Sequence, residues 1–418
     1  MALGEKVVGV SLERNTPGND CGYLALICLL DRHVLVYERL AGMQNKNRLF
    51  DLSDGGVFMM RYLLFIVIGL FCSGTLWAEI ARTVSGKPDL SGFYNTNMLI
   101  PLERPSDYGE EKYMTEEQSK GRLGFLDFLE SSNEKSDPNR GAPAKGGDGN
   151  NAAGAGGVGG YNAFYIDPGT ELHAIDGKIR NSIIYDPPNG RRPDFTSDGQ
   201  AKVLKLAASF IHDNDGTASW LSRRGGGPGP FDGPETLALS ERCLLGFDGA
   251  APALPSLYNN YKRIIQTEDH VMILFEMVHD ARIIKMDGEH NDQSIRDWQG
   301  DSVGRWEGDT LVVETKNFTK FNGLMGADEN LQLTERFTLR EDGDILYDFT
   351  VDDPTAWMGA WSGDYLWKAT DGKVYEYACH EGNYSMGNIL RGARILESEY
   401  KGMIPDANEE WYQALQAR

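Results

Sequence analysis

Long apolar runs are scarce in this chain. The apolar segment Tyr62–Phe71 is too short to span a bilayer comfortably, which takes about 20 residues. It follows Arg61 and is followed by Ala78, and together these features form the three-part pattern of a secretory signal peptide. We therefore expect residues 59–78 to be a cleaved signal peptide, and we expect no stable membrane anchor after its removal.

This signal pattern begins nearly sixty residues into the sequence. The simplest interpretation is that translation starts at Met59 or Met60, so that residues 1–58 reflect a mis-set start or form a disordered extension. The alternative is a genuine N-terminal extension that precedes a membrane anchor. Residues 1–58 show neither a helical nor a strand period, which favours the first interpretation.

An excess of basic residues is also missing. The first 78 residues hold seven basic and seven acidic side chains, so the whole net charge of −21 falls on the residues that follow. This charge opposes binding to nucleic acids or anionic lipids, because phosphate contacts need a positive surface. It favours a small neutral or cationic molecule as the partner. The sequence leaves the oligomeric state open.

Several common chemical motifs are missing as well. No pair of histidines beyond residue 78 has the spacing of a zinc motif, so we expect no metal. A literal G-x-G-x-x-G occurs at Gly154, Gly156 and Gly159, but it lies in a glycine-rich tract without the strand and helix that dinucleotide binding requires. We therefore expect no cofactor. A G-x-S-x-G nucleophile elbow is also missing.

Cysteine is rare, and its distribution is informative. Of five cysteines, only Cys243 and Cys379 lie beyond residue 78. An even pair in an exported protein predicts a disulfide. It would close a loop of more than 100 residues, for which the chain-entropy model gives about 4–5 kcal/mol of stabilisation. The alternative is two buried free thiols.

Glycine and turn residues divide the remaining chain. We expect residues 79–250 to form a loop-rich region that packs on an antiparallel β domain at 251–398, followed by a C-terminal tail at 399–418. In the first region, Thr115 and Gln118 have the spacing of a capping box and predict a helix start. Apolar residues at helical spacing predict a second helix over 201–212.

The β domain is predicted from short apolar runs separated by Asp-Gly and Gly-Asp turns. Six strands are expected, at 271–278, 281–286, 310–315, 331–339, 345–351 and 373–379. Strands of this length and spacing favour a mainly β fold, an antiparallel barrel or sandwich with a loop-rich N-terminal half and few short helices. The pattern is lipocalin-like by analogy of fold.

Ionisable residues interrupt the predicted apolar rows. Because side chains alternate across a strand, His279 would share a face with Phe275, and Glu335 would share one with Phe337. His380 falls at the end of the row on the last strand. A buried charge is costly unless it is paired or serves a function. These rows therefore predict a polar cluster in an apolar interior.

Two short segments supply the candidate catalytic residues. We interpret His279 and His380 as acid/base groups, Asp280 and Glu381 as carboxylates that orient them, and Arg282 as a charge-stabilising group. The alternative is a structural ion pair between Asp280 and Arg282 beside a histidine with satisfied hydrogen bonds.

The candidate ligand-binding residues are aromatic or charged: Glu335, Trp298, Trp306, Arg305 and Tyr377. The two tryptophans would form a wall of the binding site, and Arg305 would stack on the ligand or bind a carboxylate. The alternative is a packed hairpin corner for the tryptophan-rich segment, and an arginine or tyrosine partner for Glu335.

Three strings of residues resemble those of a widespread group of uncharacterised exported bacterial proteins. They are GRWEGDTLVVETKNF from Gly304, HDARII from His279 and YEYACHEGNY from Tyr375, and the resemblance covers about Pro88 to Arg394. It implies export and carries no established activity.

These observations predict a periplasmic or secreted protein that binds a small apolar or phenolic molecule in a cavity of the β domain. Metal-free acid/base chemistry of the lyase or hydrolase type is one interpretation of that cavity. The alternatives are a non-catalytic carrier of the lipocalin type and an extracellular interaction module.

Overall fold

The structure is a computed structural model, and it describes residues 80–134, 167–210, 217–223, 231–246, 251–320, 324 and 326–402. The predicted signal peptide, residues 1–58 and the glycine motif at Gly154–Gly159 lie outside these ranges. Within them, no helix combines the length and the apolar character needed to cross a membrane.

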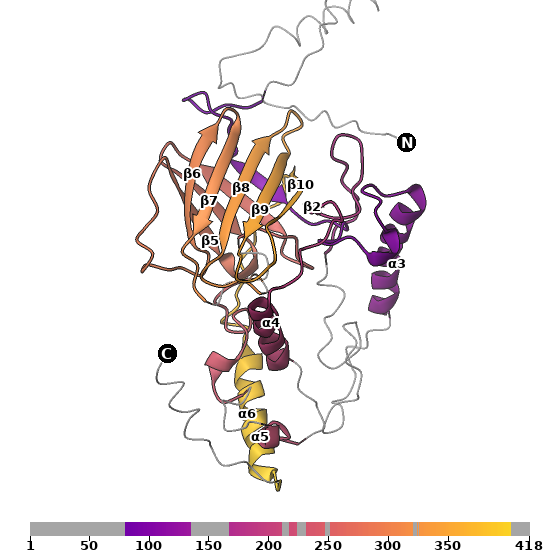
Figure 1. The fold of residues 1–418 in the computed structure, drawn as a ribbon, viewed down its shortest axis with the longest axis vertical. Helices are drawn as coiled ribbons and strands as arrows, with labels where there is room; N and C mark the ends of the chain where they lie inside the picture. The colour runs from indigo at the N-terminus through magenta and orange to yellow at the C-terminus, as the bar shows by residue number, and fades with distance from the viewer. Residues whose placement is uncertain are drawn as a thin grey trace, which may run out of the picture. The chain divides into compact units, whose positions relative to one another are not determined.

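A closed barrel of nine strands forms the centre of the described chain (Figure 1). Its wall runs β1, β3, β4, β5, β6, β7, β8, β9, β10, and β10 pairs with β1 to close it, while β2 adds to β10 as a tenth strand. The prediction of a mainly β fold with a barrel is confirmed. The strands are β1 Gly92–Asn95, β2 Ile184–Asp186, β3 Tyr261–Gln266, β4 His270–Phe275, β5 Ala281–Met286, β6 Asp301–Glu307, β7 Thr310–Lys316, β8 Gln332–Leu339, β9 Ile345–Asp352 and β10 Trp361–Ala369.

The predicted strands agree with β4, β5, β7, β8 and β9 in place, and β5 agrees at both ends. The prediction of a strand over 373–379 is wrong, because this segment is irregular after β10 ends at Ala369. The chain leaves the barrel wall after Ala369, so the alternating residues of this segment do not belong to a strand. Strands β1, β2, β3, β6 and β10 were not among the six predicted.

One strand pair departs from the antiparallel pattern within the described barrel. Strands β5 and β6 pair in parallel, with Lys285 opposite Val303, whereas the other strand pairs are antiparallel. Parallel neighbours cannot be joined by a tight turn, because the chain must first return to the end at which the first strand began. Residues 287–300 make this return.

Large side chains fill the inside of the barrel. The inward row of β10 carries Trp361, Tyr365 and Trp367, each at most 1% exposed. They meet Tyr347 and Phe349 of β9, and the Tyr347 and Trp367 rings lie 5.1 Å apart. Burying one large apolar side chain stabilises a fold by about 1.5–3 kcal/mol, so this cluster is a major part of the core.

Strand β10 shares one edge between two partners. Near its start, Ser362 and Gly363 pair with β2, and near its end, Lys368 and Ala369 pair with β1. Gly363 permits the close approach of β2, since a Cβ there would lie 2.7 Å from the Phe349 ring and 3.1 Å from the carbonyl oxygen of Ile183. The barrel therefore closes through a short seam that two separate segments complete.

Three helices lie between β1 and β3 in the described chain and one follows β10: α3 Glu116–Glu134, α4 Ser197–Phe210, α5 Trp220–Arg223 and α6 Tyr384–Glu399. Short 3-10 turns occur at Ser106–Tyr108 (η2), Pro234–Thr236 (η4) and Met277–His279 (η5). The predicted capping box of α3 is confirmed, because the Thr115 N–H donates to Gln118 Oε1 and the Gln118 N–H to Thr115 Oγ1. Helix α4 confirms the predicted helical spacing, and α6 was not predicted.

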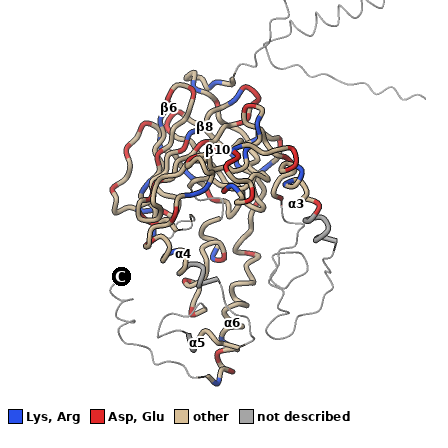
Figure 2. The backbone as a smooth tube through the Cα atoms, turned by 45° about the vertical axis from the view of Figure 1, so that its right-hand side comes forward, with Lys and Arg blue, Asp and Glu red and all other residues tan. Residues whose placement is uncertain are grey.

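Charged residues of both signs are interspersed along the barrel strands and loops (Figure 2). On the outer face of β6 to β8, for example, Arg305 contacts Glu307 and Glu314, and Arg336 contacts Glu307. Such exposed pairs contribute little to stability, about 0–1 kcal/mol each. They keep the outer face of the barrel polar.

Candidate functional site

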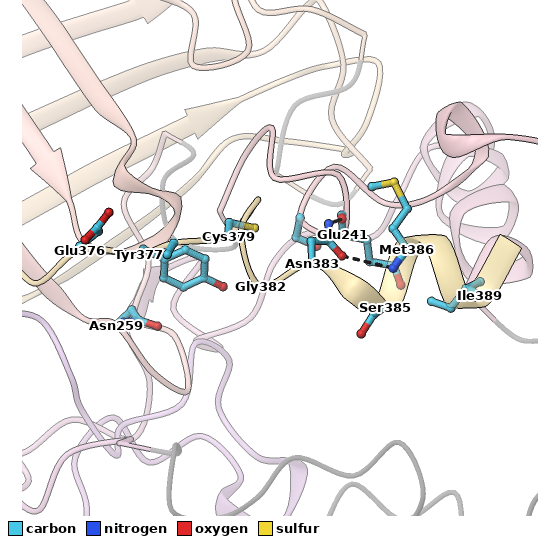
Figure 3. Close-up of a pocket in the computed structure, with 12 residues that line it drawn as sticks. Glu241, Asn259, Glu376, Tyr377, Cys379, Gly382, Asn383, Ser385, Met386 and Ile389 are labelled. Atoms are coloured by element: carbon cyan, nitrogen blue, oxygen red, sulfur yellow. Dashed lines mark hydrogen bonds between the residues drawn. The ribbon is translucent and has the colours of Figure 1, made fainter. Parts of the chain in front are cut away.

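A groove lies beside the segment that follows β10 (Figure 3). Its volume is about 480 Å³. Most of its lining comes from the end of this segment and the first turns of α6, and the rest comes from residues before β3. The lining residues are Ser240, Glu241, Asn259, Glu376, Tyr377, Ala378, Cys379, Gly382, Asn383, Ser385, Met386 and Ile389.

The disulfide between Cys243 and Cys379 fixes the middle of the groove wall. The two Cα atoms lie 5.9 Å apart, and the predicted disulfide is confirmed. It links the irregular segment after β10 to the loop that precedes β3. Because Cys379 itself lines the groove, the covalent link sets the distance between two of its walls.

Hydrogen bonds hold the same segment on either side of the disulfide. Before it, the Tyr375 N–H donates to Glu276 Oε1 over 3.3 Å. After it, Asn383 Nδ2 donates to the carbonyl oxygen of Glu241 over 2.8 Å, and Asn383 Oδ1 accepts from the Met386 N–H. The second contact caps α6 at its N-terminus. Asn383 therefore positions both the helix and the loop that face the groove.

Glu276 sits at the point where the segment meets the end of β4. Its side chain is buried, and burial raises the pKa of its carboxyl group, although hydrogen bonds from Tyr375 and Tyr261 oppose this effect. The carboxyl group accepts a backbone N–H rather than lining the groove. We therefore read Glu276 as an anchor for the segment.

His279 comes close to the groove segment without joining an apolar row. Its Nδ1 lies 3.2 Å from the carbonyl oxygen of Tyr377, and its side chain is exposed. The prediction that His279 shares the face of Phe275 is wrong, because β4 ends at Phe275 and Val278 and His279 adopt positive φ angles of 57° and 49°. The turn η5 interrupts the alternation of side chains along β4 and leaves His279 exposed.

The neighbours of His279 point to different partners. Asp280 accepts the Gly246 N–H over 3.0 Å, while Arg282 enters the interior of the barrel. There it forms a paired contact with Glu335, in which Nη2 and Nη1 each lie 2.9 Å from a carboxylate oxygen. The structure thus gives Asp280 a backbone partner at Gly246 and joins Arg282 to Glu335.

A buried polar network surrounds this ion pair. The Tyr347 hydroxyl donates to Glu335 Oε1 over 2.6 Å and accepts the Ala253 N–H, while the Tyr365 hydroxyl donates to the Ala253 carbonyl oxygen. Burial and the nearby carboxylate hold the pKa of Tyr347 well above its usual value. The network ties the loop at Ala253 to the barrel wall, and it explains why Glu335 lies in an apolar row.

His380 and Glu381 lie on the turn that follows Cys379. Both side chains are exposed, and neither is among the described residues that line the groove. The His380 carbonyl oxygen accepts the Asn383 N–H, so this residue contributes backbone to the turn. The predicted position of His380 at the end of a strand is wrong, since residues 370–379 directly before it form no strand.

The predicted tryptophan wall divides between two faces. On β6, Trp306 packs against the core cluster, whereas Arg305 points outward to Glu307 and Glu314. Adjacent residues of a strand face opposite sides, so these two cannot line one cavity. Trp298 is partly buried in the loop before β6. Among the predicted ligand-binding residues, Tyr377 lines the groove.

Several residues of the groove and of α6 form a sequence pattern that is typical of a helix start. Asn383 is a favoured N-cap residue, and Met386, Ile389, Leu390 and Ala393 have helical spacing after it. Together they would have predicted α6. Glu241 and Asn259 carry no comparable signal, because they reach the groove through the disulfide and through the position of β3.

The groove combines an aromatic ring, aliphatic side chains and carboxylates. Tyr377 and Asn259 lie toward one end and Met386 and Ile389 toward the other (Figure 3). Glu241 and Glu376 are acceptors, although one oxygen of Glu241 already accepts the Ala238 N–H. Within the described residues, no three histidine, cysteine or carboxylate side chains gather in a way that would hold a metal ion.

Comparison with the models of known protein families and with curated proteins finds no match to this chain.

Proposed function

We propose that this chain is an exported binding protein whose groove holds a small aromatic molecule with a phenolic hydroxyl or an amine. One observation carries the proposal: the groove is lined by Tyr377 and Glu376 at one end, by Met386 and Ile389 at the other, and by Glu241 between them. Ligand sites are mostly apolar, with a few polar groups that fix orientation. A carboxylate accepts a hydrogen bond from a phenol or an ammonium group.

Charge supports the choice of ligand. The chain has a net charge of −21, and both ionisable side chains that line the groove are acidic, leaving aside Tyr377. An anionic ligand would meet like charges, whereas a cationic one would be attracted. We therefore expect the order of affinity to be cationic phenol, neutral phenol, anionic phenol.

Binding without acid/base chemistry fits this groove better than catalysis by the histidine segments. His279 approaches it through a backbone carbonyl oxygen, and His380 is exposed on the turn. Neither places an imidazole beside a carboxylate in the groove, as a general base with an orienting group requires. The Arg282–Glu335 pair is enclosed in the barrel.

The binding test uses three probes of similar size and different charge: tyramine, p-cresol and 4-hydroxyphenylacetate. Titration calorimetry should show tyramine as the tightest ligand and 4-hydroxyphenylacetate as the weakest. Tyr377→Ala should weaken tyramine binding about tenfold, which corresponds to about 1.4 kcal/mol. Equal binding of all three probes would show that the carboxylates do not select the ligand.

Tyr375→Ala is the matched control, because Tyr375 lies on the same segment with its side chain 71% exposed and outside the groove lining. Its backbone N–H, which bonds Glu276, is unchanged by the substitution. Loss of affinity in this variant and not in Tyr377→Ala would contradict the proposed site.

Export is supported by the disulfide and by the signal pattern at residues 59–78, which lies outside the described residues. Mass spectrometry of the protein recovered from the periplasm or medium should give a chain that begins directly after Ala78. A cytoplasmic protein that begins at Met1, with free thiols at Cys243 and Cys379, would contradict export.

A further inference from the structure

The loop that joins the parallel strands β5 and β6 is held by one carboxylate. Asp301, the first residue of β6, accepts the Asn291 N–H over 2.7 Å and Asn291 Nδ2 over 3.1 Å. Lys285 Nζ lies 2.9 Å from Oδ1 of Asp301, and His290 Nδ1 lies 3.1 Å from Oδ2 of the same carboxylate. The side chain of Asp301 is 11% exposed, so these contacts are shielded from water.

These contacts determine which nitrogen of His290 is basic. Burial alone would raise the pKa of Asp301, but the hydrogen bonds from Lys285, Asn291 and His290 hold it below its usual value. An ionised carboxylate only accepts hydrogen bonds, so Nδ1 of His290 must carry the hydrogen. In the neutral imidazole the lone pair then lies on Nε2. This is the arrangement of a base oriented by a carboxylate.

His290 lines a hollow of about 770 Å³ between the loop and the outer face of β6 and β7. Four carboxylates and two cations also line it: Asp287, Glu289, Asp292, Glu314, Arg305 and Lys316. Arg305 and Glu314 pair with each other over 2.7 Å. The remaining charges leave an excess of carboxylates, which disfavours an anionic substrate and favours a neutral or cationic one.

We propose that His290 is the general base of a hydrolytic site in this hollow, with Asp301 as its positioning residue and a neutral or cationic carboxylic ester as its substrate. Nε2 takes a proton from a water molecule while the water oxygen bonds to the ester carbonyl carbon. The tetrahedral adduct expels the alcohol oxygen, which takes the proton from Nε2. The products are the acid and the alcohol, and the imidazole returns to its starting state. Lys316 supplies a positive charge for the developing oxyanion.

A purely structural role is the competing reading, in which His290 only fastens the loop to Asp301. His290→Asn separates the two roles, because the asparagine amide reproduces the Nδ1 hydrogen-bond donor and lacks the basic nitrogen. His270→Asn is the matched control, since His270 is an exposed histidine at the start of β4. Thermal unfolding of each variant shows whether the fold is kept.

The assay uses the whole protein with p-nitrophenyl acetate, acetylthiocholine and p-nitrophenyl phosphate. We expect kcat/KM for p-nitrophenyl acetate to fall about 100-fold in His290→Asn, as for removal of a general base. His270→Asn should keep the wild-type value, and the phosphate should be a poor substrate. Unchanged ester hydrolysis in a folded His290→Asn variant would overturn the proposal.

A spectroscopic measurement tests the geometry in the wild-type protein. Long-range ¹H–¹⁵N spectra distinguish the two nitrogens of a histidine. The neutral His290 ring should carry its hydrogen on Nδ1 and give an unprotonated Nε2. A hydrogen on Nε2 would remove the proposed base, whatever the behaviour of the variants.

Discussion

Arg282 on β5 and Glu335 on β8 meet inside the barrel through two contacts of 2.9 Å, with side chains 2% and 0% exposed. Both residues were candidates for function in the sequence, and the structure makes them partners. Their position has consequences for stability that can be measured.

Removing one member of this pair should destabilise the fold strongly. Glu335→Ala leaves the Arg282 guanidinium buried without its carboxylate, and we expect a loss of about 3–5 kcal/mol in the free energy of unfolding. The combined change Arg282→Met with Glu335→Leu should lose less, because no buried charge remains. Urea unfolding measures both. Glu314→Ala, which breaks the exposed contact with Arg305, should change stability by less than about 1 kcal/mol.

The disulfide should account for a large part of the stability. Replacing Cys243 and Cys379 with serine removes a crosslink between residues 136 positions apart, and we expect a loss of about 4–5 kcal/mol by the chain-entropy model. Thermal unfolding of the wild type with a reductant should approach that of the double variant. Reductant should leave the double variant unchanged. If the reductant leaves the unfolding temperature of the wild type unchanged, the disulfide contributes little to its stability.

Asp364 should make stability depend on pH. Burial raises its pKa to about 6 from 3.8, an effect that Arg180 partly offsets and that Asp348, opposite it on β9, strengthens. The folded state therefore binds more protons than the unfolded state between these values. The stabilisation is complete below about pH 4 and is lost as the pH rises through about 6, on the order of 3 kcal/mol.

Asp364→Asn isolates this effect. The difference in the free energy of unfolding between pH 4.5 and pH 7 should be smaller in this variant than in the wild type. Asp371→Asn, at an exposed position after β10, should retain the wild-type difference. Identical pH dependence in the wild type and Asp364→Asn would contradict the raised pKa.

Gly363 should tolerate no side chain. An added Cβ would approach the Phe349 ring and the carbonyl oxygen of Ile183, so β2 or β9 would have to move. We expect Gly363→Ala to cost about 1–3 kcal/mol, as overpacking of a core does. Gly121→Ala in α3 has open space around its Cβ and should be neutral or slightly stabilising. Thermal unfolding compares the two.

The fold was largely predictable where the strands alternate and the turns are strong. Strands β8 and β9 show period-two burial on either side of Asp342 and Gly343, and the latter has a φ angle of 85°. Strand β10 breaks this pattern, because almost every residue is buried, including Asp364, which pairs with Arg180 from a distant segment. Burial on both faces comes from distant segments and leaves no alternation to read.

The candidate site was less predictable, for two physical reasons. The alternation of side chains fails where a strand ends early, as at Phe275 before the turn that exposes His279. In addition, a carboxylate finds its partner across the sheet. Asp301 binds Lys285 because β6 returns beside β5, and a sequence does not show which strand lies next to which.

The position of the disulfide divides the barrel wall into two kinds of strand. All the strands from β3 to β10 lie between Cys243 and Cys379, whereas β1 and β2 come earlier in the chain. Strand β1 meets β10 through only the pairs at Tyr94 and Asn95. We therefore expect local opening between β1 and β10, while the strands from β3 to β10 remain within the loop that the disulfide closes. Amide hydrogens of β1 would then exchange with solvent ahead of those in β8 and β9.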